Sequence, residues 1–213
     1  MGAGRWQRSL AELLKKHGFR SLLVDTNRRN TQAARMAGLD CMNGSVLNEH
    51  FVDRMELGGI GRVFAATPND LVNVLAVKKL TRIFGRANAY QVAPINPGED
   101  KKTQKKAEGR TEARILFDEK ASWQDLDRRI ATKSVFKATP LSDEFTLDHF
   151  KERYGEKALP LFVLTEKKNL QVFEADEELT AEAGDTLISL VEEPPPEEEG
   201  DDSETQTNAA AAS

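Results

Sequence analysis

Two kinds of hydrophobic pattern alternate along the first 95 residues. Apolar residues at helical spacing predict helices at 5–17, 31–37, 47–57 and 70–84. Short apolar runs predict strands at 21–25, 39–42, 62–67 and 87–92. Strands that alternate with helices through short loops are typical of an α/β fold with a Rossmann-like, doubly wound parallel sheet.

The pattern changes after a polar segment. Strands are expected at 113–117 and 134–139, on either side of a helix at 123–131. A second helix at 145–154 precedes expected strands at 159–165, 170–175 and 185–191. Turn signals between the last three runs favour an antiparallel set, and hence a smaller α+β domain.

These changes in pattern divide the chain into four parts. We expect a Rossmann-like domain at 1–95, a linker at 96–110, an α+β domain at 111–191 and an acidic tail at 192–213. The linker is polar, lysine-rich and interrupted by Gly and Pro. The tail has three consecutive prolines and a block of acids but no aromatic residue, so we expect it to be disordered.

The net charge of −5 is unevenly distributed. Residues 1–110 hold 19 Lys and Arg against 10 Asp and Glu, whereas both later parts are acidic. A basic first domain suits an anionic ligand or partner. The basic linker lacks interleaved aromatic residues, so we expect no nucleic-acid partner.

Cysteine content and hydropathy indicate the compartment in which the protein is found. Cys41 is the single cysteine, which excludes an intrachain disulfide and favours a reducing, cytosolic location. No run approaches the 18 to 20 apolar residues of a membrane-spanning helix, so we expect no transmembrane segment in this chain.

The first residues resemble a dinucleotide-binding turn. Gly2 and Gly4 run into a helix, and Asp25 ends the next predicted strand 21 residues after Gly4. In such folds the glycines let the backbone approach a pyrophosphate, and the acid binds a ribose. The expected cofactor is NAD or another adenine nucleotide, although Gln7 replaces the third glycine and Trp6 adds bulk beside the turn.

The strand that should precede this turn is missing, because only Met1 stands before Gly2. In a doubly wound sheet that strand is central and would lie between the strands predicted at 21–25 and 62–67. We therefore expect the chain to be the C-terminal part of a longer protein, or to have a misassigned start.

Several stretches carry a family resemblance. LLVDTNRRN, AARMAGLD, GIGRVFAATPNDLVNVLA and FGRANAYQV resemble the RCK or KTN domain, the regulatory nucleotide-binding domain of potassium channels and of Trk and Kef transporters. The similarity is greatest to the version behind the membrane domain of bacterial sodium:proton antiporters. ARILFDEKASWQDL and AGDTLISLV resemble the second cytosolic domain of those proteins.

The resemblance implies a non-catalytic regulatory region at the inner face of the cell membrane. Its partners would be a membrane transporter domain, upstream in the same chain, and a second copy in a homodimer. The implied nucleotide-binding residues are Gly2, Gly4, Asp25, Asn27, Arg28, Thr67, Pro68, Asn69 and Asp70. Asn73 matches a recurrent asparagine of the family.

Other interpretations stay open for these residues. Asp25 is also compatible with a turn, and Asn69–Asp70 with a helix N-cap, which we favour. His17, His50 and His149 are isolated in sequence, so neither a metal site nor catalysis is expected. Trp123 and Phe162 are predicted to be core residues.

Two alternative functions remain. An NAD-dependent oxidoreductase would need a general acid or base, and no constellation of His, Lys or Tyr supplies one. A free-standing Trk-type regulatory subunit for potassium uptake would need an intact first strand.

Overall fold

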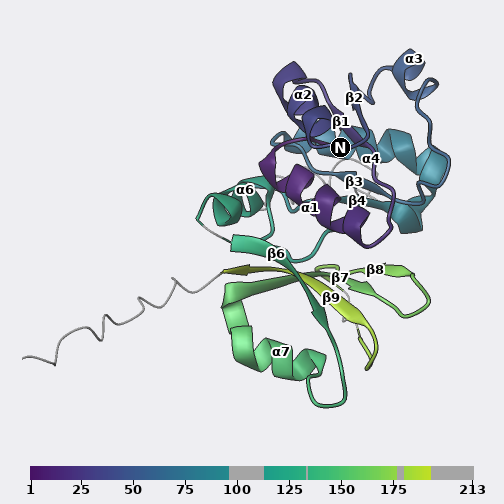
Figure 1. Ribbon diagram of the computed structural model, residues 1–213. Helices are drawn as coiled ribbons and strands as arrows, with labels where there is room; N and C mark the ends of the chain where they lie inside the picture. Colours follow the sequence, from purple (N-terminus) through teal and green to yellow (C-terminus); the bar gives the residue numbers. More distant parts are fainter. Residues whose placement is uncertain (96–112, 133, 177–179, 193–213) are drawn as a thin grey trace, which may run out of the picture.

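The computed structural model (Figure 1) describes residues 1–95, 113–132, 134–176 and 180–192. The expected linker at 96–110 and the acidic tail beyond Glu192 lie outside these residues.

The first module alternates helices and strands as the hydrophobic pattern predicts. Its elements are α1 (Arg5–Lys16), β1 (Leu23–Asp25), α2 (Arg28–Met36), β2 (Cys41–Asn43), α3 (Glu49–Val52), β3 (Val63–Ala65), α4 (Asp70–Phe84), the 3-10 turn η1 (Arg86–Asn88) and β4 (Ala89–Gln91). Asn27, Asn48 and Asn69 each accept a backbone N–H with the side chain and so begin α2, α3 and α4.

Helix α3 is shorter than the predicted helix at 47–57. It ends at Val52, and Gly58 and Gly59 follow, with Gly59 at a φ of +78°. Phe51 and Val52 are buried, whereas the residues on either side of α3 are mostly exposed. The apolar spacing over 47–57 therefore reflects one buried turn and a loop, not a continuous helix.

The parallel sheet is divided into two pieces. β1 pairs with β2, and β3, β4 and β5 (Arg114–Ile115) form a three-stranded piece, all in parallel register. β1 and β3 are not paired with each other, as expected for a doubly wound sheet without its central strand. Within the described part of the chain, Met1 and Gly2 bridge one end of this gap through bonds to Phe64 O and Val24 O.

Strand β5 corrects the place given to residues 113–117. The hydrophobic pattern predicts this run in the second domain, but β5 pairs in parallel with β4 and forms the outer strand of the first sheet. It also contacts the other module, because Phe117 N–H donates to Phe173 O and Ala175 N–H donates to Ile115 O. The domain to which a short strand belongs depends on which strand it pairs with, and the hydrophobic pattern of the short strand does not reveal its partner.

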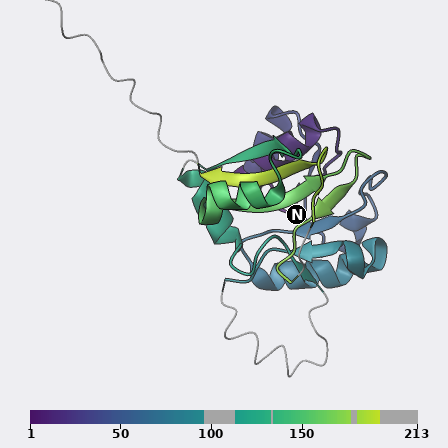
Figure 2. The same cartoon turned by 90° about the horizontal axis from the view of Figure 1, so that it is seen from below.

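The second module is an antiparallel sheet with one helix on its outer face. Its elements are α6 (Trp123–Ala131), β6 (Ser134–Pro140), α7 (Leu147–Tyr154), the 3-10 turn η2 (Gly155–Lys157), β7 (Ala158–Leu164), β8 (Leu170–Val172) and β9 (Thr186–Glu192). The strand order is β6-β9-β7-β8, and each pair is antiparallel, as predicted for the last three strands. The pairing of β6 with β9 was not predicted. Figure 2 shows α7 lying across this sheet, where Leu147 and Phe150 are buried.

The inner face of that sheet shares a core with the first module. Helix α1 lies between the two in Figure 1, and its Trp6, Leu10 and Leu14 pack in one cluster with residues of β7 and β9. Phe162 is fully buried in this cluster, with its ring centroid 5.8 Å from that of Phe64 and 5.3 Å from that of Phe117. The two modules are therefore joined by packing as well as by the chain.

This shared core generates a prediction about Phe162. Phe162→Ala should lower the free energy of unfolding by about 3–5 kcal/mol, because it leaves a cavity among residues of both modules. Phe145→Ala, a matched change at a half-buried ring beside α7, should have a smaller effect. Chemical denaturation gives both values, and amide exchange shows where protection falls. Faster exchange confined to the second module would contradict a shared core.

Candidate functional site

A pocket of about 460 Å³ lies at the carboxyl ends of β1 and β3, beside the start of α1. Its lining comes from the glycine turn, from the loops that follow β1, β2 and β3, and from α6. Ligands in open α/β sheets bind at this edge, where helix N-termini and loop side chains converge. The pocket is therefore the candidate site.

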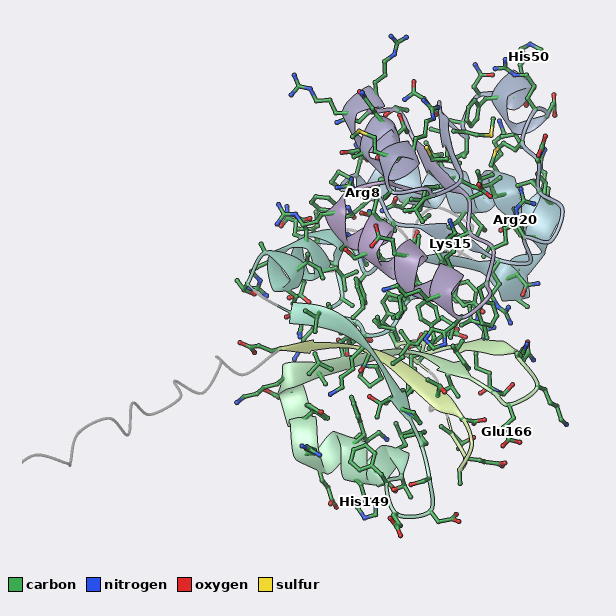
Figure 3. The ribbon with its side chains drawn as sticks, in the orientation of Figure 1. Arg8, Lys15, Arg20, His50, His149 and Glu166 are labelled. Atoms are coloured by element: carbon green, nitrogen blue, oxygen red, sulfur yellow. The ribbon has the colours of Figure 1, made fainter. Side chains whose placement is uncertain are left out.

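Gly2 is required by its backbone and by a close contact, and Gly4 lies against Gln7. A Cβ on Gly2 would lie 2.6 Å from the carbonyl oxygen of Ala66, and Gly2 has a φ of +91°. A Cβ on Gly4 would lie 2.6 Å from Oε1 of Gln7. The turn is held further by Arg8, whose guanidinium donates to Ala3 O at 2.6 Å and lies at the start of α1 in Figure 3.

Gln7 stands where a dinucleotide-binding turn has its third glycine. Its side chain is 6% exposed, and its Nε2 donates to Ala66 O at 2.7 Å, which ties α1 to the end of β3. A side chain therefore occupies the space that a glycine would leave for close approach of helix and strand. Trp6, by contrast, does not line the pocket; it is buried in the shared core.

Asp25 is the only charged side chain among the described residues that line the pocket. Its Oδ2 accepts the N–H of Ala3 and the Nδ2 of Asn30, both at 2.9 Å, and its Oδ1 accepts the N–H of Asn27 at 2.8 Å. The carboxylate thereby joins the glycine turn to the start of α2. Asp25 therefore belongs to the turn that begins α2, and it also lines the pocket.

The loop after β3 is positioned by a buried asparagine. Asn73 is 1% exposed; its Oδ1 accepts the N–H of Thr67 at 2.9 Å and the hydroxyl at 2.7 Å, and its Nδ2 donates to Thr67 O at 2.9 Å. These three bonds satisfy the polar groups of Thr67 and fix the loop over the pocket.

The pocket brings together seven of the nine residues expected at the site: Gly2, Gly4, Asp25, Asn27, Thr67, Pro68 and Asn69. Arg28 and Asp70 are not among its lining residues. Asp70 turns away, and its Oδ2 accepts the N–H of Ile95 at 2.9 Å. Asn69 is the N-cap of α4, as favoured, because its Oδ1 accepts the N–H of Val72 at 3.0 Å.

Other lining residues were missed or given a structural role. Asn30 lies in the first turn of α2, three residues after Asn27, and lines the pocket. The sequence pattern predicts this helix from residue 31, so it gives no reason to place Asn30 beside the loop after β1. Gly44 and Ser45, in the loop after β2, also line the pocket, and Ser45 Oγ accepts the N–H of Leu47 at 3.2 Å.

Trp123, expected in the core, packs against the shared core and also lines the pocket. It is the first residue of α6, after the N-cap Ser122. The segment before α6 contacts the segment after β4, because the N–H of Ala93 donates to Ala121 O at 3.2 Å. No pattern within the first 95 residues could indicate a lining residue from α6.

The three histidines are not part of this pocket. His50 on α3 and His149 on α7 lie at opposite ends of the molecule in Figure 3, and His17 ends α1 far from its first turn. Among the described residues, no group of three or more His, Cys, Asp or Glu side chains could hold a metal ion.

The role of Asn73 is testable through stability. Asn73→Ala should lower the free energy of unfolding by about 2–4 kcal/mol, because it leaves the amide and carbonyl of Thr67 without their partner in a partly buried place. Asn69→Ala, which removes only an N-cap, should cost about 1 kcal/mol. Urea denaturation of both variants makes the comparison. Equal losses would mean that the Thr67 contacts add nothing beyond a helix cap.

Comparison with known proteins gives a family match over the first half of the chain. Residues 1–109, half of the sequence, match the TrkA-N domain family. A comparison with curated proteins gives no match. Among solved structures 33 chains are similar, including the crystal structure of the GsuK RCK domain, with 11% identity and a TM-score of 0.30.

That similarity covers 80% of this chain and 43% of the GsuK chain, so the present sequence spans less than half of its length. No helix among the described residues is both long and apolar enough to span a bilayer. TrkA-N domains are regulatory domains of cation transport systems, and by the match over residues 1–109 this chain belongs to the TrkA-N domain family.

Proposed function

We propose that the chain is a non-catalytic regulatory region of a monovalent cation transporter, of the cation:proton antiporter type, and that an adenine nucleotide is its ligand. The supporting observation is the pocket in which the Asp25 carboxylate, the first turn of α1 and the loop after β3 converge. Regulation requires a ligand that prefers one arrangement of the protein, and this pocket is where it would bind.

The ribose end of the nucleotide would bind at Asp25. A carboxylate has about four acceptor positions, and three are already used by Ala3, Asn27 and Asn30. One position is left for a hydroxyl of the ribose. A bidentate contact to both hydroxyls would require the Asn30 bond to break, so the contribution of Asp25 is that of one charge-assisted bond, about 1.5–3 kcal/mol.

The phosphate end would bind at the first turn of α1. No side chain caps this helix at Gly4, so its first N–H groups are available to an anion. The described lining residues include no Lys or Arg, and the buried amide of Gln7 fills the base of the turn. We therefore expect weak binding, in the range of about 10–500 µM, with NAD or AMP favoured over the more highly charged ATP.

Trp123 provides the link to the second module. A nucleotide in the pocket would contact α6 as well as the glycine turn, because Trp123 lines the same space. Ligand binding would then favour one packing of α6 against α1, and a differential affinity of this kind is the physical basis of allosteric coupling.

The remaining parts of the proposal concern partners and place. The regulated partner is a membrane transporter domain, joined upstream in the same chain, which places the region on the cytoplasmic side of the cell membrane. The active form is a homodimer, for which α4 offers an apolar surface. Leu71, Leu75 and Ile83 of α4 are 66%, 43% and 51% exposed.

Neither alternative function gains support from a specific observation. An oxidoreductase needs a proton-transferring group beside the ligand, and the described lining residues of the pocket contain no His, Lys, Cys or Tyr. A free-standing subunit would need a complete central strand in its sheet.

Removal of the Asp25 carboxylate tests the ligand site. Titration calorimetry should show binding of NAD and AMP to the wild-type chain, and Asp25→Ala should weaken it about tenfold or more. Asp70→Ala is the matched control, because it removes a carboxylate that lies outside the pocket and holds Ile95. Circular dichroism checks that both variants are folded.

Titrations with NAD and NADP test whether Asp25 binds the ribose of the ligand. NADP should bind more weakly than NAD, because its 2′-phosphate would face the carboxylate. In the host cell, Asp25→Ala should alter sodium or potassium flux, measured with an ion-selective electrode, while Asp70→Ala, outside the pocket, should not. Absence of binding by the wild type would refute the nucleotide, and unaltered flux would refute its regulatory role.

The position of Trp123 predicts a fluorescence signal. The chain has two tryptophans, and Trp6→Phe leaves Trp123 as the only reporter. NAD or AMP should quench its emission with the affinity found by calorimetry. Trp123→Phe, in which the buried Trp6 remains, should show no change on titration. Binding detected by calorimetry without quenching of Trp123 would place the nucleotide away from α6.

A further inference from the structure

The sheet of the first module has two halves, and the candidate pocket lies over one of them. In a dinucleotide-binding fold each half binds one nucleotide, at the carboxyl ends of its strands. The pocket lies over the half that holds β1 and β2, and Thr67–Asn69 after β3 forms its far wall. Among the described residues that follow β4, Val92–Ile95, none lines it. A second nucleotide would have to lie beyond that wall, over the end of β4.

The chain that leads into α6 covers the end of β4. Ala93 forms an isolated parallel bridge with Ser122, and its N–H donates to Ala121 O at 3.2 Å. Ala93 is 0% exposed and Ala121 is 1% exposed, so each covers the other. Trp123, the next residue, lines the pocket. Residues Ala121–Trp123, which we name the plug, therefore close the pocket on the side of β4.

The four residues after β4 have no main-chain N–H left for a ligand. Three donate within the protein and the fourth is a proline: Val92 to Ala65 O at 3.0 Å, Ala93 to Ala121 O at 3.2 Å, Ile95 to Asp70 Oδ2 at 2.9 Å, and Pro94. Phosphate and ribose groups bind to main-chain N–H groups and acidic side chains in such folds. The first turn of α1 differs, because no side chain caps it at Gly4.

The plug is held in place by the core that the two modules share. Trp123 packs against this core, and Leu126 of α6 is 1% exposed within it. Ser122 Oγ accepts the N–H of Asp125 at 3.2 Å and so begins α6. Figure 1 shows α6 beside the start of α1. A ligand that displaced the plug would expose apolar surface of the shared core, which weakens its binding.

The size of the pocket suits one nucleotide. Its volume of about 460 Å³ lies in the lower half of the roughly 300–1,000 Å³ that small-molecule sites span. NAD consists of two mononucleotides joined through their phosphates. If its adenosine phosphate fills the space between Asp25 and the first turn of α1, its second half has to lie where the plug is.

We propose that the site is selective for adenine mononucleotides, because the plug occupies the place of the second nucleotide of a dinucleotide. This inference rests on the proposed function and specifies its ligand class. The ribose and phosphate of AMP bind between Asp25 and the start of α1, as does the AMP half of NAD. The nicotinamide half of NAD meets Trp123 and gains no hydrogen bond from the residues after β4, so Trp123 determines the specificity.

A series of ligands tests this selectivity by titration calorimetry on the full chain. AMP, ADP-ribose and NAD share the same adenosine phosphate, and nicotinamide mononucleotide carries only the second half. In about 0.3 M salt, which reduces the effect of their different charges, AMP should bind at least about fivefold more tightly than ADP-ribose or NAD. Nicotinamide mononucleotide at millimolar concentration should neither bind nor displace AMP.

Substitution of Trp123 tests the plug itself. Trp123→Ala should reduce the preference for AMP over NAD at least about threefold, because it opens space for the second ribose. Gln124→Ala, an exposed neighbour outside the pocket, is the control and should keep the preference of the wild type. Trp123→Leu keeps an apolar side chain against the shared core and should shift the preference in the same direction. Circular dichroism shows which variants are folded.

The outcomes separate this inference from the proposed function. Tighter binding of NAD than of AMP, displacement of AMP by nicotinamide mononucleotide, or an unchanged preference in both Trp123 variants would overturn the mononucleotide site. Each of these results would leave an adenine nucleotide as the ligand. Binding of neither AMP nor NAD to the wild type would overturn the proposed ligand and this inference together.

Discussion

The organisation of the first module depends on how two main-chain groups hold the halves of its sheet together. β1 and β3 belong to separate hydrogen-bonded pieces, and the Met1 and Gly2 nitrogens reach one piece each. Gly2 can do so because a side chain there would collide with the Ala66 carbonyl. The same turn then starts α1, which packs on the second module and defines one wall of the pocket.

Much of this architecture follows from local sequence. The sequence predicts the strand–helix alternation, the helix at 70–84 with its Asn69 cap and the antiparallel set at 159–191, because burial imposes a clear period on each. The sequence does not predict which sheet β5 joins, and it predicts α3 to be longer than it is. Both depend on long-range pairing or packing that leaves little trace in a window of a few residues.

The candidate site divides in the same way. Glycine spacing and Asp25 identified the turn and the end of β1, since these features have fixed positions in a dinucleotide-binding fold. The side-chain bonds of Asn73 to Thr67, the inward turn of Gln7 and the approach of Trp123 arise from the folded geometry. Asp70 shows the opposite case: an acid adjacent to the expected loop holds Ile95 and takes no part in the pocket.

The pairing of β5 with β4 affects how the two modules can be separated or exchanged. The sheet partner of β4 comes from beyond residue 112, so the first module is completed by chain that follows the expected linker. A recombination or cleavage event between β4 and β5 would remove the edge strand of one module and leave it attached to the other. In any reshuffling of these modules among larger proteins, β5 has to be inherited with the first.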